Sequence, residues 1–509
     1  MTHDLSSFRV WVASLALATP WPALAGPPIH DSAEPFARFT LPEEWQTRFW
    51  ASPNAKALLK LTPKEVAELV PTQAGLRFCR CPACDAEEAD EPLDWSLATP
   101  KGLTCRKCGV TLPNDKYPAA DDKKKVPEEV VEVLPGVSHH YPYHEVEPNR
   151  QRHAGERLYL AAKADEQARV FLAKAALYAA SGAARPSADA ESQTLATLAA
   201  VIVLRFAQVY PQYATHVDQP GSPKFFQQAN LGPPYRIGYK TAKWDWSGSL
   251  DVPLNLVIAY ALIRDRPELI EAGTLLGDAN PHRTIERDLF RASARFVADQ
   301  PEEFNEAALQ ATRGILAVAR LLRDPAMLRD GLARLERLTT RGFTHDGYWC
   351  QGSLRAHLRV VDQLDGWIAR LVNERSGPSG LALAREAGAV VLTDTPSPEI
   401  LQASWPAPAR GDVPRSPGLL GGAGIARLAI GEGSDALDLE LRSLHTAGPD
   451  RIQRQAMRLG VAGRAVLGDL DEQQGLPSGW DRSTVSHNTV LVNGLNQRES
   501  LAGAREQAP

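Results

Sequence analysis

Apolar residues recur every three or four positions through the middle of the chain, a spacing that places one apolar stripe along a helix. One such stripe runs from Leu195 to Val209. Repeated helix pairs without a sharp sequence repeat fit an α/α toroid or a helix bundle. Four later helices are expected between Pro- and Gly-bearing loops, at Leu254–Ile263, 285–297, 307–322 and 354–371.

After these helices the pattern changes to the alternation of apolar and polar residues that half-buried strands show. It is clearest at 425–430 and 437–441, and the run 489–492 leads into an Asn-Gly turn. A stretch rich in Pro, Ser and Gly at 393–422 is predicted to be the linker between the helical part and the β-part of the chain. The sequence therefore predicts a β-domain after the helices. We interpret this domain as truncated, because it ends without an obvious closing strand.

The N-terminus resembles a secretory signal. Arg9 precedes an apolar run at 10–18, and an A-x-A-like cleavage site follows at 23–25, although Asp4 weakens the positive charge expected at the start. The run is too short to span a bilayer as a stable helix, and no later stretch reaches 18 apolar residues. We predict a signal peptide at 1–25, a secreted or periplasmic protein and no stable membrane insertion.

Four of the six cysteines form two Cys-x2-Cys knuckles with 20 residues between them. This spacing lets four thiolates converge on one tetrahedral zinc ion, with no open position for water, so the predicted role is structural. Cys79 could compete as a ligand. Disulfides are the alternative, since export leads to an oxidising compartment; spacing favours zinc. The predicted ligands are Cys81, Cys84, Cys105 and Cys108.

Composition narrows the class of protein. The chain has 509 residues, of which 44% are hydrophobic and 23% charged, so a wholly disordered protein is excluded. A net charge of −5 argues against a surface that binds nucleic acid. Eleven Trp residues suit stacking on sugar rings, and Trp244 and Trp246 are candidates for the floor of such a cleft. Packing in the core explains them equally well.

Three stretches carry the candidate chemistry, at 304–314, 345–357 and 482–494. Their order resembles that in the heparinase II/III-like polysaccharide lyases. The most specific piece is Ser-His-Asn-Thr-Val-Leu-Val-Asn-Gly at 486–494, and the loop at 346–353 matches more loosely. The resemblance covers about residues 150–500 and implies a multidomain α+β chain, with an incomplete α/α toroid followed by an antiparallel β-sandwich. A zinc-ribbon-like insert near the front also fits this family.

The resulting division of the chain has five parts. The predicted parts are a signal peptide (1–25), an N-terminal arm (26–77), the zinc-ribbon-like insert (78–117), the α/α toroid (118–385) and the apparently truncated β-sandwich domain (386–509).

The resemblance implies a secreted lyase that cleaves an acidic, uronic-acid-containing polysaccharide by β-elimination. Such a reaction removes the proton at C5, next to the carboxylate, and expels the 4-linked sugar. It needs a group that neutralises the carboxylate, a positioned base, and an acid for the leaving oxygen. The partner expected for this chain is therefore an acidic polysaccharide. The sequence names neither the sugar nor the oligomeric state.

The resemblance transfers catalytic roles unevenly. Asn305 falls at the position of the carboxylate-binding Asn, and His357 at that of the His in the Tyr-His pair. Ala356 stands where the catalytic Tyr is expected, and Gln351 replaces the usual Glu. These departures leave it uncertain whether the chain is an enzyme. His445 is a third candidate catalytic residue.

Other residues are weaker candidates. Tyr348 is a possible substitute for the absent tyrosine, as is Tyr239, and Arg355 could offset substrate charge. Asp469 and His487 match positions of metal ligands in the family, which makes a second divalent metal in the β-domain possible, although two ligands are too few for a complete site.

Two other functions compete with an active lyase. A lyase-fold protein that binds glycans without turnover is favoured by Ala356 and Gln351. A toroid glycoside hydrolase needs two acidic residues across a cleft. Asp245, Asp251 and Glu306 are available for it, but nothing in their spacing singles them out.

Overall fold

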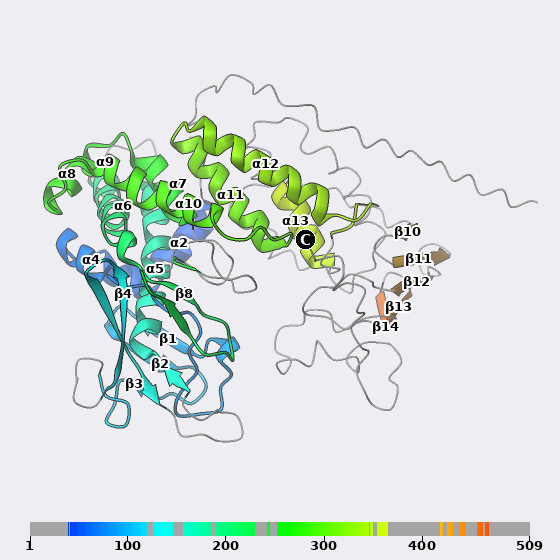
Figure 1. Cartoon of the computed structure of the whole chain (residues 1–509), viewed down its shortest axis with the longest axis horizontal. Coiled ribbons are helices and arrows are strands. Elements are labelled where there is room, and N and C mark those ends of the chain that lie inside the picture. Colours follow the sequence, from blue (N-terminus) through cyan, green and yellow to red (C-terminus); the bar gives the residue numbers. More distant parts are fainter. Residues whose placement is uncertain are drawn as a thin grey trace, which may run out of the picture.

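The computed structural model describes most of residues 39–364 and five strands further along the chain. Helices and strands occur in separate groups (Figure 1), so the α+β class is confirmed. The toroid, the β-sandwich and the domain boundaries within this class stay predictions. The described residues are 39, 41–119, 126–145, 156–184, 189–229, 242–244, 252–345, 347–349, 354–364, 418–420, 425–430, 437–442, 456–461 and 464–467.

Three short helices begin the described chain, and their starts are encoded locally. Ser52 caps the second helix, whose first residue is a proline. Thr62 and Glu65 form a reciprocal capping box at the start of the third. These helices are α2 (Glu43–Ala51), α3 (Pro53–Leu58) and α4 (Pro63–Leu69).

The cysteine-bearing insert forms a small antiparallel sheet in the order β1-β2-β3. Its second Cys-x2-Cys knuckle starts at the last residue of β2, so the sheet fixes the direction in which this knuckle leaves. A cluster of short hairpins follows. The elements are η1 (Glu88–Asp90), β1 (Leu93–Ser96), β2 (Thr99–Cys105), β3 (Thr111–Leu112), β4 (Glu128–Leu134), β5 (Val137–Pro142), β6 (His144–Glu145) and β7 (Arg157–Leu158).

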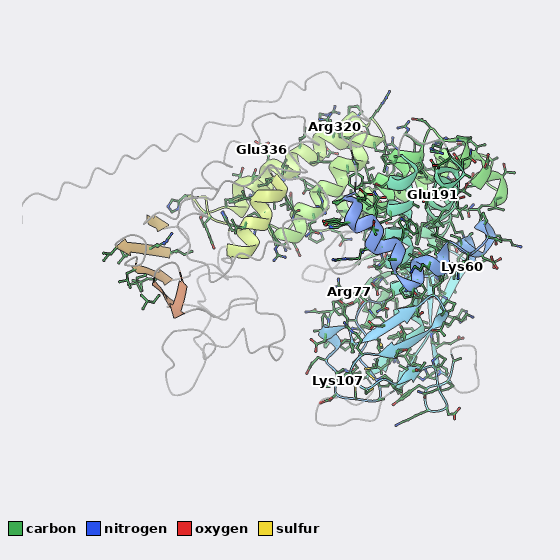
Figure 2. The ribbon with its side chains drawn as sticks, turned by 180° about the vertical axis from the view of Figure 1, so that it is seen from behind. Lys60, Arg77, Lys107, Glu191, Arg320 and Glu336 are labelled. Carbon is green, nitrogen blue, oxygen red and sulfur yellow. The ribbon has the colours of Figure 1, made fainter. Side chains whose placement is uncertain are left out.

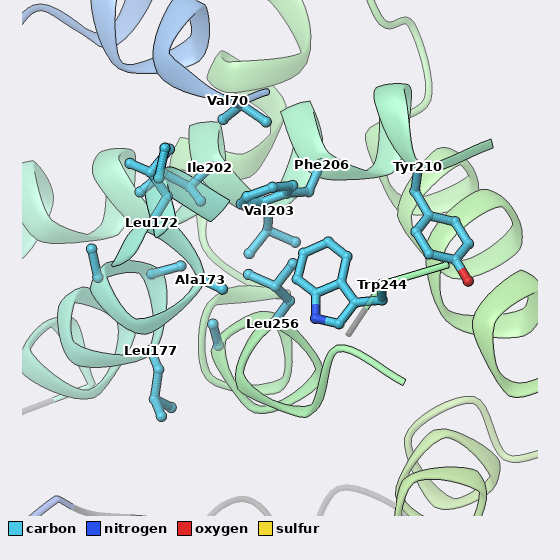
Figure 3. Close-up of a cluster of buried hydrophobic side chains, with 14 of the residues drawn as sticks. Val70, Leu172, Ala173, Leu177, Ile202, Val203, Phe206, Tyr210, Trp244 and Leu256 are labelled. Carbon is cyan, nitrogen blue, oxygen red and sulfur yellow. The ribbon is translucent and has the colours of Figure 1, made fainter. Parts of the chain in front are cut away.

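Two long helices, α5 (Leu160–Ala183) and α6 (Ala190–Val209), pack together at the centre of the helical part. The apolar stripe predicted from Leu195 to Val209 is buried as expected. Figure 3 shows Val203 and Phe206 of α6 beside Leu256 and Trp244. By length and hydropathy α6 could cross a membrane, but 72% of that window is buried inside the fold, as in a core helix of a globular protein.

Three of the four later helices lie at their predicted positions, one of them with a difference in type, and the fourth, predicted at 354–371, is described as a helix up to Gln363. The helices at 267–275, 281–284 and 325–342 were not predicted. The helix expected at 285–297 begins with a π-helical segment, where each bond spans one residue more than in an α-helix. Two short strands precede these helices. The elements are η2 (Tyr210–Gln212), β8 (Thr215–Val217), β9 (Phe225–Gln227), α7 (Leu254–Ile263), α8 (Pro267–Leu275), α9 (Pro281–Thr284), η3 (Ile285–Arg291), α10 (Ala292–Ala298), α11 (Glu306–Leu321), α12 (Pro325–Gly342) and α13 (Leu354–Gln363).

Five strands near the end form an antiparallel sheet in sequential order, as the alternating pattern predicts. In register across three strands, Arg427 lies opposite Glu440 and Glu440 opposite Arg458. The alternate positions are apolar, and Leu428 and Ile430 are exposed there. The sheet thus has one charged and one apolar face. Its strands are β10 (Gly418–Leu420), β11 (Ile425–Ile430), β12 (Leu437–Arg442), β13 (Ala456–Val461) and β14 (Arg464–Leu467).

The contact between Gly314 of α11 and Val252, two residues before the start of α7, yields a test of the packing. A Cβ on Gly314 would lie 2.7 Å from Cβ of Val252. Gly314→Ala gains about 1 kcal/mol of helix propensity, but overpacking costs about 1–3 kcal/mol. We expect a lower melting temperature, measured by thermal unfolding. In a Val252→Gly background, which removes the clashing Cβ and both methyl groups, the same substitution should raise the melting temperature, and a fall in both backgrounds would contradict this account.

Candidate functional site

The four cysteines predicted as ligands come together at one point of the insert. Their sulfur atoms all lie within 4.8 Å of one another. The Sγ atoms of Cys81 and Cys108 are 3.7 Å apart, and those of Cys84 and Cys105 are 3.8 Å apart. A disulfide needs an S–S distance of about 2.05 Å, so no disulfide joins these four cysteines. A tetrahedral metal with sulfur at about 2.3 Å has edges of about 3.8 Å. The cluster could therefore bind a metal ion.

Cys79 lies outside this cluster, although it is two residues from Cys81. Its thiol faces the carbonyl of Arg80, and burial raises its pKa to about 12. Cys105 behaves differently. Burial opposes its ionisation, but the backbone N–H groups of Cys108 and Lys107 outweigh that effect and lower its pKa to about 7. Burial raises the pKa of Cys81 and Cys84 as well as that of Cys79, so among the described cysteines it is the ligand geometry that favours the two knuckles over Cys79.

A second candidate site lies where the loop before α13 folds back on that helix. His357 has no exposed surface, and its Nδ1 accepts a hydrogen bond from the backbone N–H of Trp349 at 3.1 Å. The Tyr348 ring stacks on the imidazole with centroids 4.7 Å apart and an angle of 9°. Tyr348 is also fully buried. The structure therefore joins two residues that the sequence selected separately.

The bond to Trp349 fixes the proton on His357. Because Nδ1 accepts, the neutral ring carries its proton on Nε2. In this state Nε2 is a hydrogen-bond donor and has no lone pair for a proton. The arrangement suits donation to an oxygen atom.

Asn305 is the N-cap of α11. Its Oδ1 accepts the backbone N–H of Ala308 at 2.9 Å, and its Nδ2 donates to Glu303 at 2.6 Å. The side chain is half-buried. Helix α13 packs against α11, but no contact between Asn305 and His357 is present among the described residues. The cap therefore accounts for the conformation of Asn305.

Trp244 lies in the core. It is 7% exposed, its ring is stacked against Tyr213 at 6.2 Å, and the guanidinium of Arg169 lies 4.7 Å from its centroid. Figure 3 shows it between Phe206 and Tyr210. Packing explains its place without a sugar.

For the other predicted site residues, the structure describes no side-chain contacts. Arg355 lies in α13, without a described side chain, and Ala356 is the next residue of that helix. Outside the described residues lie the signal peptide and Trp246, Tyr239, Gln351, His445, Asp469 and His487.

Sequence reasoning missed a cluster at the π-helical segment. The Tyr260 hydroxyl lies 2.8 Å from Nδ1 of His282 and donates to Oε1 of Glu286 at 2.9 Å. Burial raises the Tyr260 pKa above its usual range. Sequence reasoning also missed Arg313 of α11, whose pKa burial lowers to about 10. The only sequence signal for the Tyr260 cluster is a Glu four residues after a His on one helical stretch. No sequence signal distinguishes Arg313.

The geometry defines a mixed α+β protein with an insert whose four clustered thiols could bind a metal ion. No protein-family model and no curated protein matches the chain. Three similar solved structures are a heparinase III with methylated lysines (15% identity, TM-score 0.42, 65% of this chain and 56% of that one), another heparinase III (14%, 0.41, 61% and 55%) and the heparan sulfate lyase HepC from Pedobacter heparinus (14%, 0.41, 91% and 70%).

These solved structures are of heparinase III and of a heparan sulfate lyase, the kind of protein that the sequence motifs resemble. The chain spans just over half the length of the two heparinase III chains. At these identities and TM-scores, site and substrate are argued from the chain's own residues.

The role of Asn305 as N-cap of α11 gives a prediction on the stability of the folded chain. Asn305→Ala should cost about 1 kcal/mol, because the N–H of Ala308 loses its acceptor. Asn305→Asp keeps the cap oxygen but places a second carboxylate beside Glu303 at an exposed contact, so it should cost less than Asn305→Ala. Urea unfolding of both variants measures the difference. Equal stability of Asn305→Ala and the unsubstituted chain would contradict the assignment of the cap.

Proposed function

We propose that this chain is an exported polysaccharide lyase that cleaves a uronic-acid-containing polysaccharide by β-elimination. The observation that carries the proposal is the contact between the loop at 347–349 and His357, because both belong to stretches in which the sequence resembles polysaccharide lyases. The cleaved polymer, the export and the five-part division of the chain belong to the same proposal.

In β-elimination a base takes the C5 proton, the C4–O bond breaks, and a C4=C5 double bond forms. The leaving oxygen then receives a proton. The step is slow in water because the adjacent carboxylate opposes a second negative charge at C5. Donors placed at that carboxylate therefore lower the barrier.

His357 is the donor in this scheme. Its Nδ1 is occupied by the N–H of Trp349, so Nε2–H can hydrogen-bond the carboxylate or protonate the leaving oxygen. The amide Nδ2 of Asn305 is a second donor, since the cap uses only Oδ1 and the bond to Glu303 uses one of the two amide hydrogens. Neither group removes the C5 proton in this state.

The base is proposed to be the side chain of Tyr348 as its phenolate, which becomes the neutral hydroxyl when it takes the C5 proton. Ala356 occupies the position of the family's tyrosine, and Tyr348 is the tyrosine that stacks on His357. This assignment requires substrate to reach a ring that has no exposed surface, so the loop at 347–349 has to open.

A net charge of −5 repels a polyanion at long range, so the cleft needs local cations. Arg313 on α11 is one, because even with a pKa lowered to about 10 its side chain is charged at neutral pH. Arg355 on α13 and His445 are further candidates for contact with the substrate.

The metal of the insert is proposed to be zinc in a structural role. Four thiolates at tetrahedral edge lengths suit a soft, closed site, and zinc supplies a cross-link between the two knuckles when bound. A second divalent metal at Asp469 and His487 stays a proposal from the resemblance.

A glycan-binding protein without turnover is the second candidate. The specific observation in its favour is that His357 and Tyr348 are both fully buried, while Ala356 carries no proton to transfer.

Activity separates the two functions. The full chain should form an unsaturated, ultraviolet-absorbing product from alginate, heparin or heparan sulfate. Tyr348→Phe keeps the stacked ring but removes the hydroxyl, so the rate should fall by about 10²–10⁴. Asn305→Asp should also lower the rate, whereas Asp189→Asn, the matched exchange at the cap of α6, should not.

Calorimetric binding of these polymers without any absorbing product would favour the binding protein. Turnover that gives only saturated products would favour the hydrolase.

Metal analysis tests the insert. The purified chain should contain one zinc per molecule, and Cys84→Ser should lose it because three thiolates leave one position open. Cys79→Ala is the matched control, since Cys79 lies outside the cluster, and it should retain zinc. Equal loss in both variants, or disulfides found by thiol counting, would contradict the assignment.

A further inference from the structure

Two lysines outside the insert have their ammonium groups buried beneath it. The side chain of Lys163, on α5, has no exposed surface, and that of Lys224, before β9, is 5% exposed. A buried ammonium needs fixed acceptors, because desolvation of an unpaired charge is costly. The residues that supply these acceptors therefore hold the two lysine side chains in their buried positions.

Lys163 takes most of its acceptors from the insert and the chain leading into it. Its Nζ donates to the carbonyl of Arg77 at 2.6 Å and lies 3.4 Å from Oε2 of Glu91. Glu166, one turn along α5, is the third partner at 3.2 Å. Arg77 also pairs with Glu91 at 2.6 Å, which holds this carboxylate between the two cations.

Lys224 is held in a similar way. Its Nζ lies 2.9 Å from Oε1 of Glu88 in the insert and 3.0 Å from Oδ1 of Asp218. The other oxygen of Glu88 accepts the N–H of Gly221 at 2.7 Å. Asp218, which is fully buried, in turn accepts the N–H of Phe78 at 3.2 Å.

The acceptors lie on both sides of the first knuckle. The accepting carbonyl of Arg77 precedes Cys81, as does Phe78, whose N–H donates to Asp218, and the carboxylates of Glu88 and Glu91 follow Cys84. The second knuckle is tied to the same place, because Arg106 donates to the carbonyl of Asp90 at 2.9 Å. In Figure 2, Arg77 lies nearer the helices and Lys107, beside the second knuckle, at the far end of the insert. A metal that joins the knuckles therefore fixes the spacing of both sets of acceptors.

We propose that metal binding by the four cysteines and docking of the insert on α5 are one coupled event, with Lys163 and Lys224 as its buried contacts. The inference rests on the proposed zinc site and goes beyond a local structural role. Loss of the metal frees the segment 77–91, and both ammonium groups then become accessible while the α5–α6 core stays folded. The accessibility of the surface beside α5 would thus depend on whether the four cysteines hold a metal ion.

Lysine acetylation of the full chain tests this coupling. The zinc-loaded chain and the same chain after chelation under reducing conditions are treated with acetic anhydride, and modified peptides are measured by mass spectrometry. Acetylation of Lys163 and Lys224 should rise at least about tenfold on zinc removal. Lys60, which is exposed, is the internal control and should react equally in both states. Deuterium exchange within Ala190–Val209 should stay slow in both states.

Coupling also predicts the reverse effect, because linkage is reciprocal. Glu88→Gln and Glu91→Gln leave the thiolates intact but weaken the docking contacts, so the dissociation constant for zinc should rise about tenfold. Glu87→Gln is the matched control, since Glu87 is exposed beside Glu88, and zinc affinity should not change.

The outcomes separate the inference from the site on which it rests. A chain that binds no zinc overturns both. A chain that binds zinc but keeps Lys163 and Lys224 unreactive after its removal overturns the coupling and leaves the zinc site standing. Fast exchange throughout Ala190–Val209 on zinc removal also overturns it, because the response would then be global unfolding.

Discussion

The burial of the Lys163 ammonium is the constraint on which the junction between insert and helices depends. Breaking a buried ion pair typically costs about 3–5 kcal/mol, a large part of the stability of an ordinary domain. The chain crosses α5 at Gly75, where a Cβ would lie 2.3 Å from the backbone nitrogen of Glu166. This close approach lets Leu76 donate to the carbonyl of Ala162 and brings the Arg77 carbonyl to Lys163.

The same constraint explains an unusual backbone conformation. Glu91 ends η1 with a φ of 47°, in the left-handed region that glycine or asparagine normally occupies. A glycine there would relieve the backbone but would remove the carboxylate that lies between Arg77 and Lys163. The strain is therefore offset by the two cations that this carboxylate serves.

Much of the fold follows from local pattern. Helix α7 has the bounds that the spacing of apolar residues predicts, and strands β11 and β12 begin where the alternation begins. The π-helical segment could not be predicted in this way. It is accompanied by a hydroxyl from α7, Tyr260, that bonds both His282 and Glu286, and a bond between separate elements leaves no period in the sequence.

In the candidate site, too, some features could be predicted from local sequence and others depend on contacts between distant residues. Spacing alone identifies the four cysteines, because the two knuckles are local turns. The exclusion of Cys79 depends on the direction of its thiol, which faces the carbonyl of Arg80 in the folded insert. Trp244 is a further case. A tryptophan beside a loop reads equally well as a sugar platform or as core, and the choice depends on Phe206 and Tyr213, which lie more than thirty residues away in sequence.

The position of one proton limits the chemistry available around His357. A histidine acts as a base only through a nitrogen with a free lone pair, and the Trp349 N–H occupies the one on Nδ1. For Nε2 to accept a proton, the loop that carries Trp349 would have to release Nδ1. Such a release would also unstack Tyr348. The loop thus couples the protonation state of His357 to the exposure of the only tyrosine that the described residues place against it. An active lyase would therefore need this loop to open, whereas a protein that only binds glycans would not.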